Sequence, residues 1–200
     1  MEITQTIDKP EGKYRHMGRF AFFIESLKNI RTVGTVTRSS RFLCQSVVRH
    51  ADLKKAHVVV ELGAGDGVMT RHLLKAMSKD SYLISFEINK VFCERLSKIN
   101  DSRLIIINDS AETLAQVIES RGLDKVDVVV SALPFSVFSE DLTKAIVGQC
   151  HALMRAGGRF VQIHYSLKTK EIYRNIFGNV GSAFEVRNIP PAYVLYCFKT

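Results

Sequence analysis

Three glycines at alternating positions form the part of the sequence best suited to bind a ligand. They follow the β-branched run 58–60, which predicts a short buried strand. The run leads into Glu61-Leu62-Gly63-Ala64-Gly65-Asp66-Gly67, and a helical pattern follows over 66–77. Glycines let the backbone approach a ligand closely, and the free N–H groups at a helix start point toward it. The spacing therefore predicts a cradle for a nucleotide-like ligand.

A carboxylate at the end of the next apolar run supports this interpretation. Glu87 closes the run 82–86, twenty residues after Gly67. A carboxylate in this place can accept hydrogen bonds from both hydroxyl groups of a ribose. The glycines do not match the dinucleotide fingerprint, because Val68 stands where its third glycine would be. A chance glycine turn in an ordinary α/β protein is the alternative, and the coincidence of acids, glycines and helix favours the cofactor site.

The elements that must position these residues alternate along the chain. Strands are expected at 82–87, 103–108, 125–131 and 159–165, and helices at 41–51, 89–98, 110–120, 140–154 and 168–177. Two short strands near 184–188 and 193–198 must form a hairpin, so one of them runs antiparallel. The alternation predicts an α/β fold with a largely parallel sheet and helices on both faces.

The E-x-G-x-G-x-G segment with its downstream acid resembles motif I of the class I S-adenosylmethionine-dependent methyltransferases. The resemblance implies a Rossmann-like sheet of seven strands, and S-adenosylmethionine as the cofactor with S-adenosylhomocysteine as its product. It also implies that Asp109 accepts a hydrogen bond from the adenine amine, with a helix N-cap at Asp109 or Ser110 as the alternative. The residues expected at the cofactor are Glu61, Gly63, Ala64, Gly65, Gly67, Glu87, Ile88, Asp109, Ser110 and Ser131.

The positive charge of the chain is concentrated near its beginning. The 200 residues carry a net charge of +8, and residues 1–55 hold eleven Lys/Arg against five Asp/Glu. Residues 18–30 predict a basic amphipathic helix with aromatic side chains on its apolar face. We therefore expect a helical leader over 1–55 in front of a cofactor-binding part over 56–200, within one structural domain. An anionic membrane surface or a nucleic acid fits this leader, and a solvated basic face or a helix packed on the core is the alternative.

Cysteine usage and the N-terminus indicate the compartment. Cys44, Cys93, Cys150 and Cys197 are far apart, which fits free thiols in a reducing cytoplasm better than disulfides or a metal site. The early apolar run 20–24 is too short to span a bilayer, and no signal peptide is expected. The prediction is a cytoplasmic protein, peripheral at the inner membrane face, without a metal.

Resemblances to two families imply different acceptors of the methyl group. Ala132-Leu133-Pro134-Phe135 resembles the Asn-Leu-Pro-Tyr segment of the rRNA adenine dimethyltransferases, where the amide and backbone hold the target amine and the ring stacks on the base. Here Ala132 replaces the amide. The leader over 22–40, the segment 131–134 and the tail over 188–196 are more similar to bacterial phospholipid N-methyltransferases of the phosphatidylethanolamine type. That resemblance implies methylation of a lipid amine head group, of ethanolamine or ornithine; RNA or a small molecule is the alternative acceptor.

An acceptor amine must be neutral before it can attack a methyl group. Tyr165, the Ser131 hydroxyl and the Leu133 carbonyl are the expected proton-accepting groups, with His164 as an alternative general base. Side chains alternate along a strand, so His164 and Tyr165 cannot both face the site, and we expect Tyr165 to do so. Aromatic faces attract methylated ammonium groups, and a cation would bind a lipid phosphate. The residues expected at the acceptor are Pro134, Phe135, Phe138, Arg38, Arg41 and Lys168.

Overall fold

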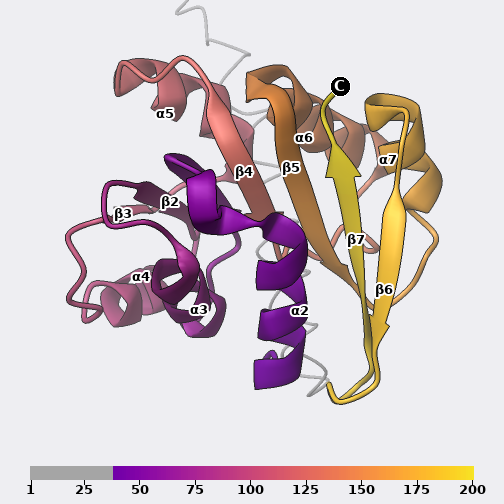
Figure 1. Cartoon of the computed structure of the whole chain (residues 1–200), viewed down its shortest axis with the longest axis horizontal. Helices are drawn as coiled ribbons and strands as arrows, with labels where there is room; N and C mark the ends of the chain where they lie inside the picture. The colour runs from indigo at the N-terminus through magenta and orange to yellow at the C-terminus, as the bar shows by residue number, and fades with distance from the viewer. Residues whose placement is uncertain (1–37) are drawn as a thin grey trace, which may run out of the picture. The chain divides into compact units, whose positions relative to one another are not determined.

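The computed structural model describes residues 38–200, and the helix expected over 18–30 lies outside them. One sheet of seven strands has the order β3-β2-β1-β4-β5-β7-β6 (Figure 1). Neighbouring strands among β1–β5 pair in parallel, and β7 runs antiparallel to both β5 and β6. The strands are β1 (Val58–Leu62), β2 (Tyr82–Phe86), β3 (Leu104–Ile107), β4 (Val126–Ser131), β5 (Met154–His164), β6 (Gly181–Glu185) and β7 (Ala192–Phe198). The expected α/β class and the reversed strand near the C-terminus are confirmed.

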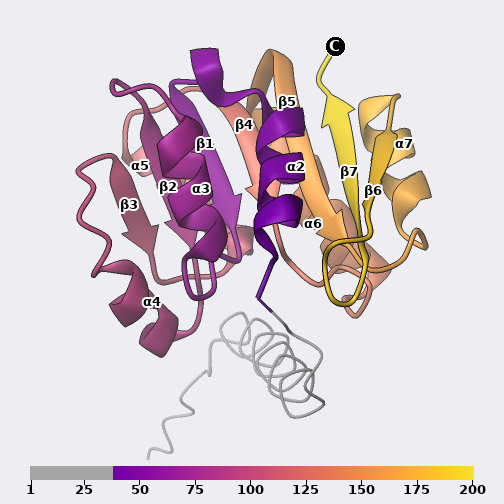
Figure 2. The same ribbon diagram turned by 60° about the horizontal axis from the view of Figure 1, so that its bottom comes forward.

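Helices cover both faces of the sheet (Figure 2). The α-helices are α2 (Arg41–Ala51), α3 (Val68–Ala76), α4 (Lys90–Leu96), α5 (Leu114–Ser120), α6 (Glu140–Leu153) and α7 (Lys170–Phe177); short 3-10 helices are η1 (Leu53–Lys55) and η2 (Ala111–Thr113). One apolar core lies under α2 and α3, and a second lies under α5, α6 and α7. Burial of these two apolar faces is the main force that holds the layers together.

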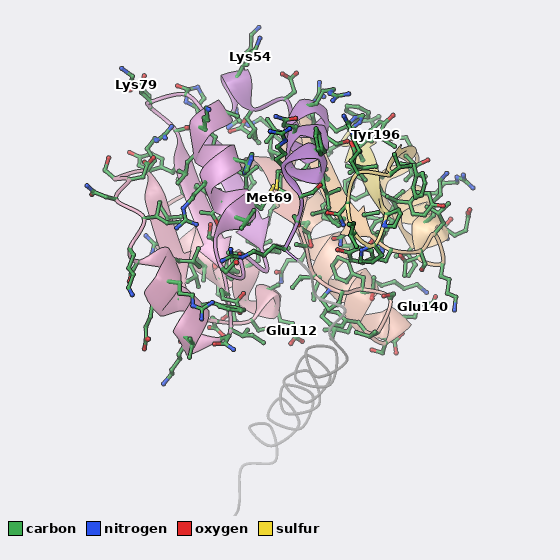
Figure 3. All side chains as sticks on the ribbon, turned by 90° about the horizontal axis from the view of Figure 1, so that it is seen from below. Lys54, Met69, Lys79, Glu112, Glu140 and Tyr196 are labelled. Atoms are coloured by element: carbon green, nitrogen blue, oxygen red, sulfur yellow. The ribbon has the colours of Figure 1, made fainter. Side chains whose placement is uncertain are left out.

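The strand directions bring most of the chemistry-bearing loops to one end of the sheet. The carboxyl ends of β1 to β6 meet at an edge that we call the carboxyl edge, where open α/β sheets bind their ligands. The turn between β6 and β7 also lies there, because Glu185 pairs with Ala192 and His164 with Tyr193. Figure 3 shows Lys54 and Lys79, which precede β1 and β2, at the end of the molecule opposite Glu112 and Glu140.

Two strand boundaries differ from the sequence prediction because of glycines that look like chain breakers. β5 begins at Met154 and runs through Gly158, where a Cβ would lie 2.8 Å from the Arg155 carbonyl oxygen. β6 begins at Gly181, where a Cβ would lie 2.2 Å from Cε2 of Tyr196. Both glycines are therefore strand residues at which a neighbour leaves no room for a side chain.

The helix over 41–51, assigned from sequence to the leader, packs with the sheet. The compact unit that contains the sheet spans Arg38–Thr200. Leu43, Cys44 and Val47 of α2 are fully buried in the core that also contains α3. The Ser40 side chain caps the helix by accepting a hydrogen bond from the Leu43 N–H. This helix therefore belongs to the body that carries the glycine loop.

Candidate active site

The glycine loop between β1 and α3 is fixed to the end of β2 by backbone hydrogen bonds. The N–H groups of Gly63 and Ala64 donate to the Phe86 carbonyl oxygen at 2.9 Å and 3.1 Å. The Gly65 N–H donates to Oε2 of Glu87 at 2.7 Å. All three glycines have positive φ, between 56° and 82°, a region that other residues rarely adopt. The loop is thus held in one shape beside the Glu87 carboxylate.

The three glycines differ in what surrounds them. A Cβ on Gly63 would lie 3.1 Å from Leu133 Cδ2, and a Cβ on Gly67 would lie 3.0 Å from Leu96 Cδ2. A Cβ on Gly65 would meet no atom within 4 Å. The backbone at Gly65 therefore borders open space at the carboxyl edge, as required of a loop that a ligand approaches closely.

Glu87 presents a fixed carboxylate at the end of β2. Glu87 is 8% exposed. Its Oε1 accepts a hydrogen bond from the Asn89 N–H at 2.8 Å, and its Oε2 accepts one from the Gly65 N–H. The Asn108 side chain donates to the Glu87 carbonyl oxygen at 2.9 Å, a contact that the sequence analysis missed. A carboxylate oxygen accepts more than one hydrogen bond, so both oxygens keep capacity for ribose hydroxyls. The residues fit a nucleoside beside the glycine loop.

Glu61 lies at the end of β1 and is turned into the interior. It is 1% exposed, and its Oε2 accepts hydrogen bonds from the hydroxyls of Thr70 at 2.8 Å and Ser85 at 2.7 Å. Its Oε1 is buried without a hydrogen-bond partner within residues 38–200. Burial raises the pKa of Glu61 to about 7, above the ordinary value of 4.5. Thr70 and Ser85 therefore fix a carboxyl group that is partly protonated near neutral pH.

This shift makes the stability of the cofactor-free protein depend on pH. Because the folded pKa lies above the unfolded one, the folded state binds the extra proton between about pH 4.5 and 7, and stability falls as pH rises through that window. Glu61→Gln keeps an acceptor for Thr70 and Ser85 and removes the ionisation. Urea unfolding at pH 5 and pH 8 measures the free energy of unfolding of both proteins. Relative to the wild type, the variant should be more stable at pH 8 than at pH 5, by on the order of 3 kcal/mol. A pH-independent difference between the two proteins would contradict the buried ionisation.

The loop after β3 contains Asp109 and Ser110, for which the sequence left two roles open, an adenine contact and a helix N-cap. The Ser110 hydroxyl accepts a hydrogen bond from the Glu112 N–H and caps η2. Asp109 is exposed at the carboxyl edge, where its Oδ1 accepts from the Ser110 N–H at 2.7 Å. Ser110 thus serves as the cap, and an adenine contact at Asp109 stays a prediction. Ile88 is half-buried in the neighbouring loop after β2.

The segment after β4 is held by buried polar contacts. Ser131 is fully buried, and its Oγ accepts a hydrogen bond from the Leu133 N–H at 3.3 Å. The Leu133 carbonyl oxygen accepts from Nε2 of Gln162 at 2.9 Å. Ser131 and Leu133, expected as proton acceptors, are therefore occupied within the loop; Pro134 beside them is half-buried. The sequence did not lead us to predict a role for Gln162. A single amide inside the apolar run 160–163 was nevertheless a signal of a buried polar contact.

Gln162 is expected to position this segment. Gln162→Leu removes the donors to Leu133 and Ile163 and also the Oε1 atom, which is buried without a partner in the described part of the chain. Turnover should fall about tenfold with unchanged cofactor affinity, because only the acceptor side of the site loses its support. Steady-state kinetics and calorimetric titration would separate the two effects. Gln149→Leu is the matched control, since the Gln149 Nε2 also donates to a backbone carbonyl oxygen and its Oε1 also lacks a partner within residues 38–200. Equal losses of turnover in both variants would contradict the positioning role of Gln162.

Phe135 packs in the core, which corrects its expected place at the acceptor. The residue is 1% exposed, with its ring centroid 5.6 Å from that of Phe138 and 6.5 Å from that of Tyr173. Phe138 is half-buried and packs against the same core. The Phe135 ring does not stand open at the carboxyl edge, because it completes the apolar layer under α6 and α7, and an acceptor contact at Phe138 stays a prediction.

His164 and Tyr165 point to opposite sides, as strand alternation predicts. His164 is 3% exposed, and its Nε2 lies 2.6 Å from the Tyr173 hydroxyl and 3.2 Å from Thr169 Oγ1. Burial lowers the pKa of His164 to about 4, so the ring is neutral and shut away from the carboxyl edge. Tyr165 is 47% exposed. Partial burial raises the pKa of Tyr165, an effect that the nearby Asn188 side chain partly offsets, so the phenol stays protonated at neutral pH.

The three expected phosphate-binding cations lie at the carboxyl edge, with different partners. Arg38 forms an ion pair with Asp66 of the glycine loop. The Arg41 guanidinium lies 4.7 Å from the centroid of the Phe42 ring, and Lys168 is exposed in the loop after β5. Asn188 joins the start of α2 to the turn between β6 and β7, because its Oδ1 accepts from the Ser40 N–H at 2.8 Å.

Comparison with known proteins gives the family. The family described as ribosomal RNA adenine dimethylase matches residues 37–182. An ornithine lipid N-methyltransferase of Singulisphaera acidiphila is 29% identical over 89% of this chain and 94% of its own length. Ribosomal RNA small subunit methyltransferase A of Thermotoga neapolitana is 30% identical over 57% of this chain and 41% of its own. The O-methyltransferase TomG of Streptomyces achromogenes, solved with S-adenosylmethionine, has a TM-score of 0.61 at 15% identity over 89% of both chains.

The strand order, the open backbone at Gly65 and the fixed Glu87 carboxylate agree with these matches. The cofactor is S-adenosylmethionine, which supplies an electrophilic methyl group on a sulfonium sulfur. The chain belongs to the ribosomal RNA adenine dimethylase family and is an S-adenosylmethionine-dependent methyltransferase.

Proposed function

We propose that the protein methylates the amine of a membrane lipid head group, of the phosphatidylethanolamine or ornithine lipid type. The observation that carries the proposal is the similarity to the ornithine lipid N-methyltransferase, which extends over nearly the whole of both chains. The rRNA methyltransferase match covers 41% of that relative's length. Support also comes from Ala132 in place of an amide and from Phe135, whose buried ring offers no face to a base.

The proposed chemistry is a direct displacement at the methyl carbon. The head-group amine, with a pKa of roughly 10 in water, must first lose a proton, which passes to solvent water because the Tyr165 phenol is itself protonated. Its nitrogen lone pair then forms the new C–N bond as the C–S bond breaks and its electron pair returns to sulfur. The work of the protein is to hold the amine in line with the methyl group and to favour its neutral form by partial desolvation. Glu87 and the glycine loop hold the nucleoside side, and Tyr165 borders the acceptor side.

Tyr165 is the proposed acceptor of the amine hydrogen bond. Tyr165 is about half-exposed as a residue, and it is the one predicted proton acceptor that is not enclosed within the described part of the chain. Tyr165→Phe should lower the turnover number about 100-fold, without changing S-adenosylmethionine affinity. Tyr193→Phe, at the β7 position that pairs with the neighbouring His164, is the control for loss of a phenol hydroxyl at this edge. A Tyr165→Phe enzyme with wild-type turnover would show that another group accepts the hydrogen bond of the amine.

The decisive experiment follows the label from methyl-labelled S-adenosylmethionine. Vesicles of phosphatidylethanolamine with an anionic lipid, vesicles with an ornithine lipid, and ribosomal RNA are incubated in parallel with the full chain. Label in either amine lipid supports the proposal and identifies the head group. Label in RNA alone overturns it and favours the rRNA reaction of the second relative. Label in none of the three, with cofactor bound, also overturns it and points to a small-molecule acceptor.

A further inference from the structure

Exposed apolar side chains are concentrated at the carboxyl edge. Among the described residues nine large apolar side chains are exposed, and seven of them lie at or next to this edge. Tyr82 and Phe198 are the two at the opposite edge. The seven are Val91, Val137, Tyr165, Leu167, Phe184, Val186 and Ile189. Single exposed apolar residues are ordinary on a protein surface, but a one-sided distribution indicates contact with another apolar phase or partner.

Two loops at this edge form a continuous surface, which we call the hairpin surface and define as residues 165–170 and 186–191. The first loop follows β5, and the second connects β6 to β7. The strand registers place the two loops side by side. Val186 is 65% exposed and Leu167 is 39% exposed. Tyr165, the proposed contact of the acceptor amine, lies in the same surface.

The charged residues within the hairpin surface are all basic. Together with residues 38–41 at the start of α2, its two loops contain five Lys/Arg and no Asp/Glu. Arg38 and Arg187 form ion pairs with Asp66 and Glu185. The other three, which have no ion pair to an acid within residues 38–200, are Arg41, Lys168 and Lys170. Glu112 and Glu140 lie elsewhere on the carboxyl edge, after β3 and β4 (Figure 3), so the basic character is local.

We propose that the hairpin surface is seated on a bilayer that contains anionic lipid, with Leu167 and Val186 in the interfacial layer and the neighbouring cations at the lipid phosphates. Apolar tips beside unpaired cations match a bilayer interface, which presents an apolar layer and anionic groups at adjacent depths. No helix within residues 38–200 has the length and hydropathy needed to cross a membrane. The inference rests on the proposed function, because this seating brings Tyr165 to the depth of the head groups.

The test measures binding of the full chain to vesicles by co-sedimentation. The variant Leu167→Ser/Val186→Ser removes two exposed apolar side chains from the hairpin surface. Tyr82→Ser/Phe198→Ser is the matched control, because it removes two exposed aromatic side chains from the opposite edge. Tyr82 is 52% exposed and Phe198 is 37% exposed. On vesicles of phosphatidylethanolamine and phosphatidylglycerol, the first variant should bind about tenfold more weakly than the wild type, while the control binds like the wild type. Calorimetric titration with S-adenosylmethionine verifies that both variants are folded.

Several outcomes would overturn the inference. Equal vesicle binding of the two variants would remove the hairpin surface from membrane contact, and absence of binding by the wild type would do the same. Wild-type binding that does not rise with phosphatidylglycerol content would contradict the role of the cations. Methyl transfer by the wild type to detergent-dispersed amine lipid is measured separately and tests the proposed function alone. If the wild type transfers the methyl group and both variants bind vesicles equally, the inference about the hairpin surface is wrong and the proposed function is supported.

Discussion

Gly65→Val should abolish S-adenosylmethionine binding while leaving the protein folded. The residue has φ of +56°, and its missing side chain borders open space next to the Glu87 carboxylate. A valine there would place two methyl groups where the loop must meet the cofactor. A β-branched residue at positive φ also costs about 1–2 kcal/mol of backbone strain, which a protein of this size can absorb. Calorimetric titration should therefore detect no binding, while circular dichroism detects a folded protein.

A second glycine separates the effect of strain from the effect of the cofactor cradle. Gly122 has φ of +66°, and a Cβ there would also meet no atom within 4 Å, but it lies in the loop before β4 at the amino edge. Gly122→Val should cost similar stability and retain wild-type cofactor affinity. Loss of affinity in both variants, or in neither, would show that Gly65 does not border the cofactor.

Glu87→Ala should produce the second large effect, a loss of S-adenosylmethionine affinity of about 100-fold or more. The substitution removes the acceptors of the Gly65 and Asn89 N–H groups together with the predicted ribose contacts. Charge-assisted hydrogen bonds contribute about 1.5–3 kcal/mol each, so the loss of several easily accounts for that ratio. Equilibrium binding of S-adenosylhomocysteine measures the change without turnover.

Glu87→Gln is the intermediate variant in the same measurement. Its amide oxygen still accepts one of the two backbone N–H groups, but the amide nitrogen faces the other donor and cannot accept. Its affinity should therefore lie between those of the wild type and the alanine variant. An alanine variant with unchanged affinity would show that the carboxylate serves only to hold the loop.

Periodicity and local motifs predicted the parts of the structure that depend on near neighbours in sequence. Strand–helix alternation predicted the sheet, the C-terminal hairpin predicted one reversed strand, and the Ser40 cap follows from the hydroxyl before the helix over 41–51. Strand alternation also predicted correctly that His164 and Tyr165 point to opposite sides. The glycine spacing indicated the cofactor cradle because backbone freedom is a property of residue type alone.

The details that sequence could not predict depend on partners far along the chain. Gln162 reaches Leu133 across 29 positions, and Asn188 reaches Ser40 across 148. The buried placement of Phe135 depends on Tyr173 and Phe138, whose packing is settled only when α6 and α7 are docked. In the same way Asp127 accepts from the N–H groups of His57 and Val58, and is a structural carboxylate rather than a site residue. Residue type determines which functional groups are present at each position. Contacts with residues far along the chain determine which of these groups are accessible to a ligand.

The reversed direction of β7 has a practical consequence for how the enzyme can be attached to a solid support. Because β7 is antiparallel to β5, the chain finishes at the amino edge, as the C label in Figure 2 shows, whereas Tyr165 and the glycine loop lie at the other end of the sheet. An affinity handle or a sensor-chip linker fused after Thr200 would therefore leave the carboxyl edge facing the solution. Immobilisation through that end presents the site to a flowing suspension of vesicles in a single orientation.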